Sequence, residues 1–342
     1  MADRKGDGWL AKQLGKPYRL VGLVGAAATL SAGALAGVAA SVGFEQVWQK
    51  LVYPHWVWLP IALGGELVAY LGYSVAYREL ARAERGPELD VPSVAALVTT
   101  GFGAFVQGGG FALDRAALER AGFSERQARE RVLGLGTLEY AVLAPATAAA
   151  AAYLLATHHD GIDPSITWSW VIGVPAGAAL ALLALRSKRL FKHEGWRMHV
   201  YASLSAIELL LRLFRRPLLA LGAFAGIALY WIGDIFVLWA ALHAFYAHTP
   251  PVAQLLVAYA TGYSLTRRAL PLGGAGIVEA LLPFALGWVA IERAAAVLAV
   301  AAYRLINLWL PMVPALAGIP TLRRLETKNV HRRQRRLAHS RR

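Results

Sequence analysis

The sequence predicts an all-α polytopic membrane protein with about six to eight transmembrane helices and one or two re-entrant hairpins. Three observations support this prediction. Of the 342 residues, 57% are hydrophobic and only 16% are charged, and the mean hydropathy is +0.45, which no ordinary water-facing surface shows. Apolar stretches close to the roughly 20 residues that cross a bilayer core recur along the chain. Basic residues gather at its two ends.

The basic ends explain most of the net charge of +14 without a nucleic-acid partner. Five Lys or Arg accompany two Asp in residues 1–20, and nine accompany one Glu in residues 321–342. Such segments beside spans are typical of cytoplasmic ends held near anionic headgroups. We therefore expect a plasma-membrane protein with both termini in the cytoplasm. A basic N-terminus over 1–17 and a basic tail over 321–342 would flank a membrane domain over 18–320.

The first two predicted spans cover residues 18–43 and about 55–77. Ser31, Gly33 and Gly37 give the first span a small-residue spacing that allows close helix contact. We expect this span to pack against other helices.

The stretch 91–113 has arginine-rich flanks on both sides and glycines in its interior. A segment that starts and ends on one side and is interrupted by glycine is better explained by a re-entrant hairpin than by a crossing. Spans at about 134–156 and 166–185 then enclose a loop without Lys or Arg, which we expect outside. Residues 199–214 predict an interfacial amphipathic helix, and 217–246 a further span.

Two paths remain open after residue 251. One has three crossings, with Arg267 and Arg268 in a cytoplasmic turn. The other has a re-entrant hairpin over about 251–290 and one crossing over about 293–318. Both return the basic tail to the cytoplasm, so the charge bias does not distinguish them.

Two parts of the chain, about 91–156 and 251–318, share a sequence pattern. Its members in the first copy are Thr100-Gly101-Phe102, Gly108-Gly109-Gly110, Gly122-Phe123 and Glu125-Arg126, and in the second Thr261-Gly262-Tyr263, Gly273-Gly274-Ala275-Gly276, Gly287-Trp288 and Glu292-Arg293. Glu139 and Arg304 occupy equivalent positions further along the two copies. Because the copies are expected to begin on opposite sides of the membrane, the pattern predicts an inverted repeat, an architecture of transporters whose substrate site lies between the halves.

Ionisable residues within the apolar segments mark the candidate site. They are Glu66, Glu139, Asp234, Arg267, Arg268, Glu279 and Arg304. Each costs about 2.5–3.5 kcal/mol on insertion scales, so it usually faces the protein interior or a pathway. Glu66, Glu139 and Asp234 are candidates for the pathway or for proton coupling.

The segment that follows Arg267 and Arg268 has the chemistry of an anion site. Gly273, Gly274 and Gly276 let the backbone approach a ligand, and a helix that starts after them points its N–H groups at an anion. With Arg267, Arg268, Glu279 and Arg304, they form the predicted binding set for a lipid phosphate. Two alternatives stay open: the arginine pair as cytoplasmic anchors, and Glu279 with Arg304 as a structural ion pair.

Metal and sulfur chemistry are not expected. The sequence has no cysteine, which excludes disulfides, thiolate metal sites and iron–sulfur clusters. His158, His159, Asp160 and Asp163 lie in a polar loop, where solvated side chains are the commoner outcome. We predict no metal, no cofactor and no catalytic residue.

The sequence between Tyr259 and Pro311 resembles the transmembrane region of the lysylphosphatidylglycerol synthases, a flippase-like membrane protein family. The similar residues are ALPLGGAGIVEALL at 269–282, Gly287, Ala294 and AAYRLINLWLP at 301–311. The family shows a proline, a glycine-rich turn, a glutamate and then a helix with a Tyr-Arg pair. In the first half it often has a proline-arginine turn followed by Gly-Glu, where this chain has Gln107-Gly108-Gly109-Gly110 and Asp114-Arg115.

The resemblance implies a flippase-like domain without the soluble synthase domain. We expect a protein that is not an enzyme and that moves an anionic phospholipid or a glycolipid headgroup across the membrane. Membrane lipids, and a separate lipid-modifying synthase, are the expected partners, and a homo-oligomer stays open. The competing hypotheses are a membrane enzyme that acts on lipid-linked substrates and a non-transporting scaffold for a lipid or envelope synthase.

Overall fold

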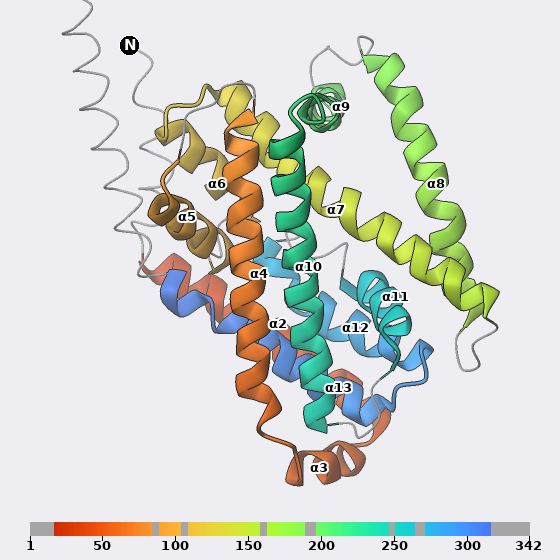
Figure 1. Ribbon diagram of the computed structural model, residues 1–342. Coiled ribbons are helices and arrows are strands. Elements are labelled where there is room, and N and C mark those ends of the chain that lie inside the picture. The colour runs from red at the N-terminus through yellow and green to blue at the C-terminus, as the bar shows by residue number, and fades with distance from the viewer. Residues whose placement is uncertain are drawn as a thin grey trace, which may run out of the picture.

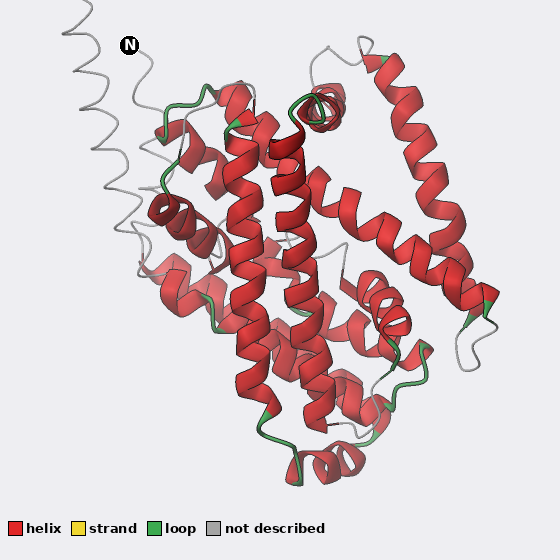
Figure 2. Cartoon of the chain, in the orientation of Figure 1, coloured by secondary structure: helices red, strands yellow, loops and turns green. Residues whose placement is uncertain are grey.

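The structure, a computed structural model, describes residues 17–83, 89–103, 109–157, 163–188, 196–245, 250–263 and 271–315. Within these ranges the chain forms helices joined by turns, without a strand (Figure 2). Six of the described helices are long and apolar enough to cross a membrane: α2 (Pro17–Val42), α4 (Trp58–Ala81), α7 (Glu125–Ala156), α8 (Pro164–Arg186), α10 (Pro217–Phe245) and the helical stretch Arg293–Ala315, which begins with α13 (Arg293–Arg304). The all-α prediction is confirmed, and the six helices are those of a multi-pass membrane protein.

Helices α4 and α10 lie side by side at the centre of the bundle and run antiparallel (Figure 1). A Cβ atom added at Gly72 of α4 would lie 2.6 Å from the Gly226 carbonyl oxygen, and one added at Gly233 of α10 would lie 2.5 Å from the Gly65 carbonyl oxygen. Neither distance leaves room for a side chain. The two backbones therefore touch at two levels of the pair, as in other small-residue contacts between membrane helices.

Helices α7 and α8 form the flank of the bundle furthest from α2 (Figure 1). Helix α7 begins nine residues before the predicted position 134, because the Ser124 side chain and Gln127 form a capping box there. Asp163 caps α8, its side chain accepting a hydrogen bond from the Ser165 N–H. Ile166 and Thr167 are the residues that α8 buries, so most of this helix faces outward.

Two pairs of described helices are too short to cross a membrane as straight segments. They are α5 (Val91–Gly103), α6 (Gly109–Arg120), α11 (Val252–Tyr263) and α12 (Ile277–Trp288). A helix of 12 residues is about 18 Å long, against a hydrocarbon core of about 30 Å. Helix α5 packs against α6, and α11 against α12.

Helix α2 packs against α12 and α13, but through fewer small residues than its sequence suggested. The expectation that this span packs against other helices is therefore confirmed. Ser31 is buried, whereas no described residue lies within 4 Å of a Cβ atom added at Gly33 or Gly37, because both glycines lie on an exposed face of α2. The short helix α3 (Phe44–Val52), which the sequence did not predict, follows α2 after Gly43, whose φ is 109°.

The predicted amphipathic helix is present as α9 (Trp196–Leu213). Its buried residues include Leu204, Leu209 and Leu213, while Leu211 is exposed. Lys188, just after α8, donates to the Glu208 carboxylate on α9, and this hydrogen bond lowers the pKa of Glu208. The ion pair ties the end of α8 to α9.

Candidate functional site

A buried ion pair joins α12 to α13. Arg304 Nε donates to Glu279 Oε1 over 2.9 Å, and the two residues are 1% and 0% exposed. Arg304 is the middle residue of the candidate span Arg293–Ala315. The glutamate and the arginine of the sequence motif are therefore direct partners inside the bundle.

Two further donors hold the Glu279 carboxylate. Ser31 on α2 donates to Oε1 over 2.8 Å, although the two residues are 248 positions apart. The Gly276 N–H donates to Oε2 over 2.8 Å, so the side chain caps its own helix. The positive N-terminus of α12 is thus already next to a carboxylate of the protein.

The Arg304 guanidinium is only partly satisfied by described residues. Its Nη2 donates to the Gly273 carbonyl oxygen over 3.0 Å, and its Nε is used by Glu279. Nη1 is buried and has no hydrogen-bond partner among the residues that the structure describes. A buried donor without a partner costs about 1–3 kcal/mol, and more when it is charged. Nη1 is therefore the atom of this pair at which an acceptor is missing.

The glycine turn before α12 has an unusual backbone. Leu272, Gly273 and Gly274 have φ angles of 58°, 61° and 71°, and Gly276 has 85°. Left-handed φ is easily adopted by glycine but is uncommon for leucine. The turn brings the Gly273 carbonyl oxygen to Arg304 and the Gly276 N–H to Glu279, which explains why glycine occupies both positions.

A second buried carboxylate lies beside this ion pair. Asp234 on α10 is 0% exposed, and Tyr303, the residue before Arg304, donates to its Oδ2 over 2.8 Å. Tyr259 on α11 donates to the same oxygen, and Asn307 Nδ2 donates to Oδ1. Tyr263 in turn donates to Asn307 Oδ1 over 3.2 Å. Several neutral donors thus converge on one carboxylate.

A local change of helix type places these side chains. Helix α13 continues as a π-helical segment over Leu305–Trp309. Segments of this type widen the helix and are frequent at functional sites. Arg304 directly precedes the π-helical segment and bonds to Glu279. Asn307 lies within the segment and bonds to Asp234.

Glu139 and Glu66 lie in other parts of the bundle. Glu139, near the middle of α7, accepts a hydrogen bond from the Tyr73 hydroxyl over 3.0 Å. Its backbone oxygen accepts one from Trp231 Nε1 over 2.9 Å. Glu66 on α4 is buried next to Gly65, at the contact with α10.

The structure thus brings part of the predicted set together. Gly273, Gly276, Glu279 and Arg304 form one cluster, Asp234 lies next to it, and Gly274 shares the turn. Arg267 and Arg268 lie outside the described residues. Sequence reasoning missed the partners Ser31, Tyr259, Tyr303 and Asn307. Their signal was weak, since polar residues with hydroxyl or amide groups are common in membrane helices.

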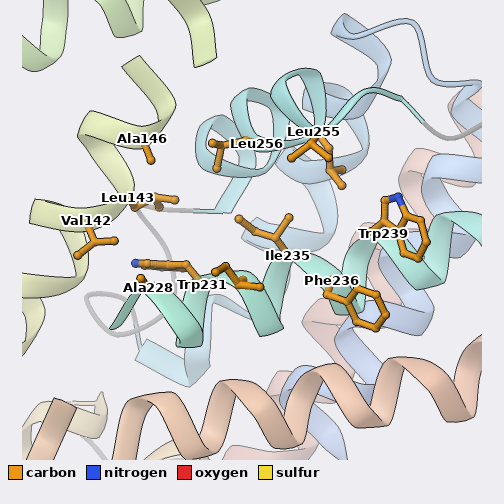
Figure 3. Close-up of a pocket in the computed structure, with 12 residues that line it drawn as sticks. Val142, Leu143, Ala146, Ala228, Trp231, Ile235, Phe236, Trp239, Leu255 and Leu256 are labelled. Carbon is orange, nitrogen blue, oxygen red and sulfur yellow. The ribbon is translucent and has the colours of Figure 1, made fainter. Parts of the chain in front are cut away.

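A separate apolar groove lies between α7, α10 and α11 (Figure 3). Its walls include Val142 and Leu143 from α7, Trp231 and Trp239 from α10, and Leu255 from α11. The volume is about 460 Å³, and every lining residue is apolar or aromatic. The groove therefore offers a very different surface from that of the buried polar cluster.

Comparisons with known proteins leave the family open. No model of a known protein family matches the chain, and no curated protein matches it. Among the described residues, no group of three or more His, Asp or Glu side chains is arranged to hold a metal ion. The candidate site therefore rests on its own geometry.

Proposed function

We propose that this protein is a lipid transporter, which moves the headgroup of an anionic phospholipid or a glycolipid across the membrane through a site between two inverted halves. Arg304 is the observation that carries the proposal. It lies in the middle of a candidate span, and its buried Nη1 has no partner among the described residues. A guanidinium matches phosphate oxygens well. The phosphate of a headgroup would supply the missing acceptor.

The contact between α4 and α10 supports the inverted repeat. The same number of residues separates Gly65 from Gly226, Gly72 from Gly233 and Thr100 from Thr261. Gly65 meets Gly233, and Gly72 meets Gly226. A two-fold rotation that exchanges the helices converts one contact into the other. Since α4 and α10 are antiparallel, equivalent helices would run in opposite directions through the membrane, as inverted repeats require.

A pair of hydrogen bonds supports the same symmetry. Tyr73 on α4 and Asp234 on α10 are separated by that same number of residues. Tyr73 bonds to Glu139 on α7, and Asp234 bonds to Tyr303 on α13. Glu139 and Arg304 are the positions that the sequence pattern makes equivalent. Each central helix thus contacts the long helix of its own half at the corresponding level.

The short helices support the re-entrant path for both halves. Helices α11 and α12 have 12 residues each, about 18 Å, which favours a hairpin over two further crossings of a core of about 30 Å. Six crossings then place both ends of the chain on one side. Basic residues at these ends favour the cytoplasmic side of the plasma membrane.

Buried acids are the proposed coupling groups. Asp234, Glu139 and Glu66 lie near the middle of their spans, where a carboxyl group that binds and releases a proton could drive transport. Asp234 is the strongest candidate because its partner Tyr303 is next to Arg304. From the motif at 269–311 alone, we propose kinship with the lysylphosphatidylglycerol synthase transmembrane region, without enzymatic activity.

Transport can be tested in liposomes that contain the purified protein and a trace of phosphatidylglycerol with a fluorescent headgroup. A reductant that does not cross the membrane bleaches only the label in the outer leaflet. We expect the wild-type protein to bring the inner label outside and Arg304→Gln to abolish this exchange. Arg304→Lys should restore it in part, because lysine keeps the charge but lacks the two-pronged geometry.

The matched control is Arg126→Gln, because the Arg126 side chain is 84% exposed. Exchange in the Arg304→Gln protein at the wild-type rate would contradict the proposed site. Mass spectrometry of the lipid distinguishes the alternatives. Chemically modified lipid would indicate a membrane enzyme, and neither exchange nor modification would favour a scaffold for a synthase.

A further inference from the structure

Two of the helices that border the apolar groove, α10 and α11, also contribute to the polar cluster. On α10, Trp231 and Ile235 line the groove (Figure 3), whereas Asp234 between them points to Tyr259 and Tyr303. The Trp231 ring meets the Tyr259 ring edge-on, with centroids 5.9 Å apart. One layer of aromatic side chains therefore separates the groove from the polar cluster.

The lining offers few partners to polar and charged ligands. None of its residues is ionisable, the indole N–H of Trp231 is already used by the Glu139 carbonyl oxygen, and the indole of Trp239 is the one other polar group among the lining side chains. A polar ligand would lose its hydrogen bonds to water without replacement. The groove instead has the volume of a small-molecule site, about 460 Å³, within the usual range of about 300–1,000 Å³.

The length of the groove is close to the depth of one leaflet of a bilayer. It runs along α10 from Ala228, near the middle of that helix, to Trp239, and then reaches Val252 at the start of α11. At 1.5 Å per residue, the stretch on α10 is about 16 Å long. Half of the hydrocarbon core is about 15 Å. The groove thus matches the depth of one leaflet.

We propose that this groove binds one hydrocarbon chain of a membrane lipid, from the leaflet at which α10 ends. The helices that form it are candidate membrane spans and a helix packed on them, so the medium at its mouth is hydrocarbon. The proposal goes beyond translocation because a chain can bind here whether or not a headgroup moves.

Photochemical labelling tests the site in the full-length protein. The purified protein in detergent micelles is titrated with a phosphatidylglycerol that carries a diazirine at the end of one acyl chain, then irradiated and mapped by peptide mass spectrometry. We expect saturable labelling of groove residues near Ala228 and Val142. Excess unlabelled phosphatidylglycerol should remove this labelling, whereas labelling of the outward face of α8 should be weak and should not saturate.

A variant that fills the groove sharpens the test. Ala228→Phe should reduce groove labelling several-fold, and Ala146→Phe, on the opposite wall, should do the same. Ala178→Phe on the exposed face of α8 is the control and should leave it unchanged. Non-saturable labelling spread equally over all outward helices would overturn the proposal, as would groove labelling that excess unlabelled phosphatidylglycerol does not remove. The unfolding temperature and the labelling of α8 are measured for each variant. A variant counts as a test of groove filling only if both values equal those of the wild type, which separates groove filling from misfolding.

Discussion

The two buried acids Glu279 and Asp234 are held by different kinds of donor. Glu279 receives donors from three separate parts of the chain: Ser31, the Gly276 backbone and Arg304. Asp234 instead receives neutral donors, from Tyr259, Tyr303 and Asn307. Hydrogen bonds to the charged form stabilise a carboxylate much as an ion pair does. The two acids therefore use different solutions to the same problem.

The ion pair should show strong coupling between its two members. Arg304→Gln leaves Glu279 buried without its cation, and loss of one partner of a buried pair costs about 3–5 kcal/mol. Glu279→Gln in the same chain removes the unpaired charge. We therefore expect the double variant to be more stable than Arg304→Gln alone, as measured by thermal unfolding in detergent.

Additive destabilisation in this double-mutant cycle would mean that the two side chains do not interact in the folded protein. Ser41→Ala serves as a reference, because Ser41 bonds only locally to the Val38 carbonyl oxygen over 2.7 Å. It should behave additively with either change.

A different arginine shows how a buried cation can be purely structural. Arg131 on α7 donates from Nη2 to the Ala83 carbonyl oxygen over 2.7 Å and from Nε to the Ala81 carbonyl oxygen over 3.3 Å. These carbonyl groups lie at the C-terminal end of α4, where a positive charge also interacts favourably with the negative end of the helix dipole. Its guanidinium lies 4.7 Å from the centroid of the Phe123 ring. The two hydrogen bonds to the carbonyl groups fasten α7 to the end of α4.

At the scale of elements, the close packing of α4 against α10 requires glycine, without a side chain, at the contact positions. Gly72→Ala would place a Cβ atom 2.5 Å from the Tyr230 nitrogen, so the helices must separate. Overpacking of this kind costs about 1–3 kcal/mol. We expect a lower unfolding temperature for Gly72→Ala and the same direction for Gly226→Ala.

Gly64→Ala is the control on the same helix. No described residue lies within 4 Å of the added Cβ atom, and alanine is favoured over glycine in a helix by about 1 kcal/mol. Its unfolding temperature should be equal to or above that of the wild type. A lower value for Gly64→Ala than for Gly72→Ala would contradict the close contact.

At the scale of the whole molecule, the topology can be tested with single cysteines, because the natural sequence has none. Asp90 and Arg126 are exposed and flank the pair α5 and α6, and Thr157 is exposed after α7. If α5 and α6 form a re-entrant hairpin, Asp90→Cys and Arg126→Cys react with an impermeant maleimide from the same side. Thr157→Cys should react from the other side, because α7 crosses the membrane between Arg126 and Thr157.

Spheroplasts and inverted vesicles provide the two sides for this measurement. Reaction of Asp90→Cys and Arg126→Cys from opposite sides would remove the hairpin and, with it, the proposed symmetry of the two halves. Labelling after solubilisation in detergent confirms that each cysteine is reactive.

The sequence predicted the elements better than their partners. Continuous apolar stretches identified the spans because hydropathy is a local property, and Glu279 and Arg304 stood out as charges within them. Ser31 did not stand out as a partner of Glu279, because the two residues are 248 positions apart in the sequence. A single serine in a helix does not indicate locally that it will bond to a distant carboxylate. Gly33 and Gly37 have favourable spacing yet face open space, whereas the contact glycines of α4 and α10 were overlooked. Which face of a helix is covered depends on the assembled bundle.

The order in which the chain is made has a consequence for Arg304. An arginine at the centre of a span opposes insertion by about 2.5–3.5 kcal/mol, so the span Arg293–Ala315 is a poor candidate to enter a bilayer alone. Ser31, Gly273 and Glu279, which bond to the arginine or to its partner, all precede Arg304 in the sequence. During synthesis from the N-terminus they leave the ribosome first. The arginine therefore enters a bilayer in which its acceptors are already present. Insertion of the last span is then expected to be coupled to its packing against the helices made earlier.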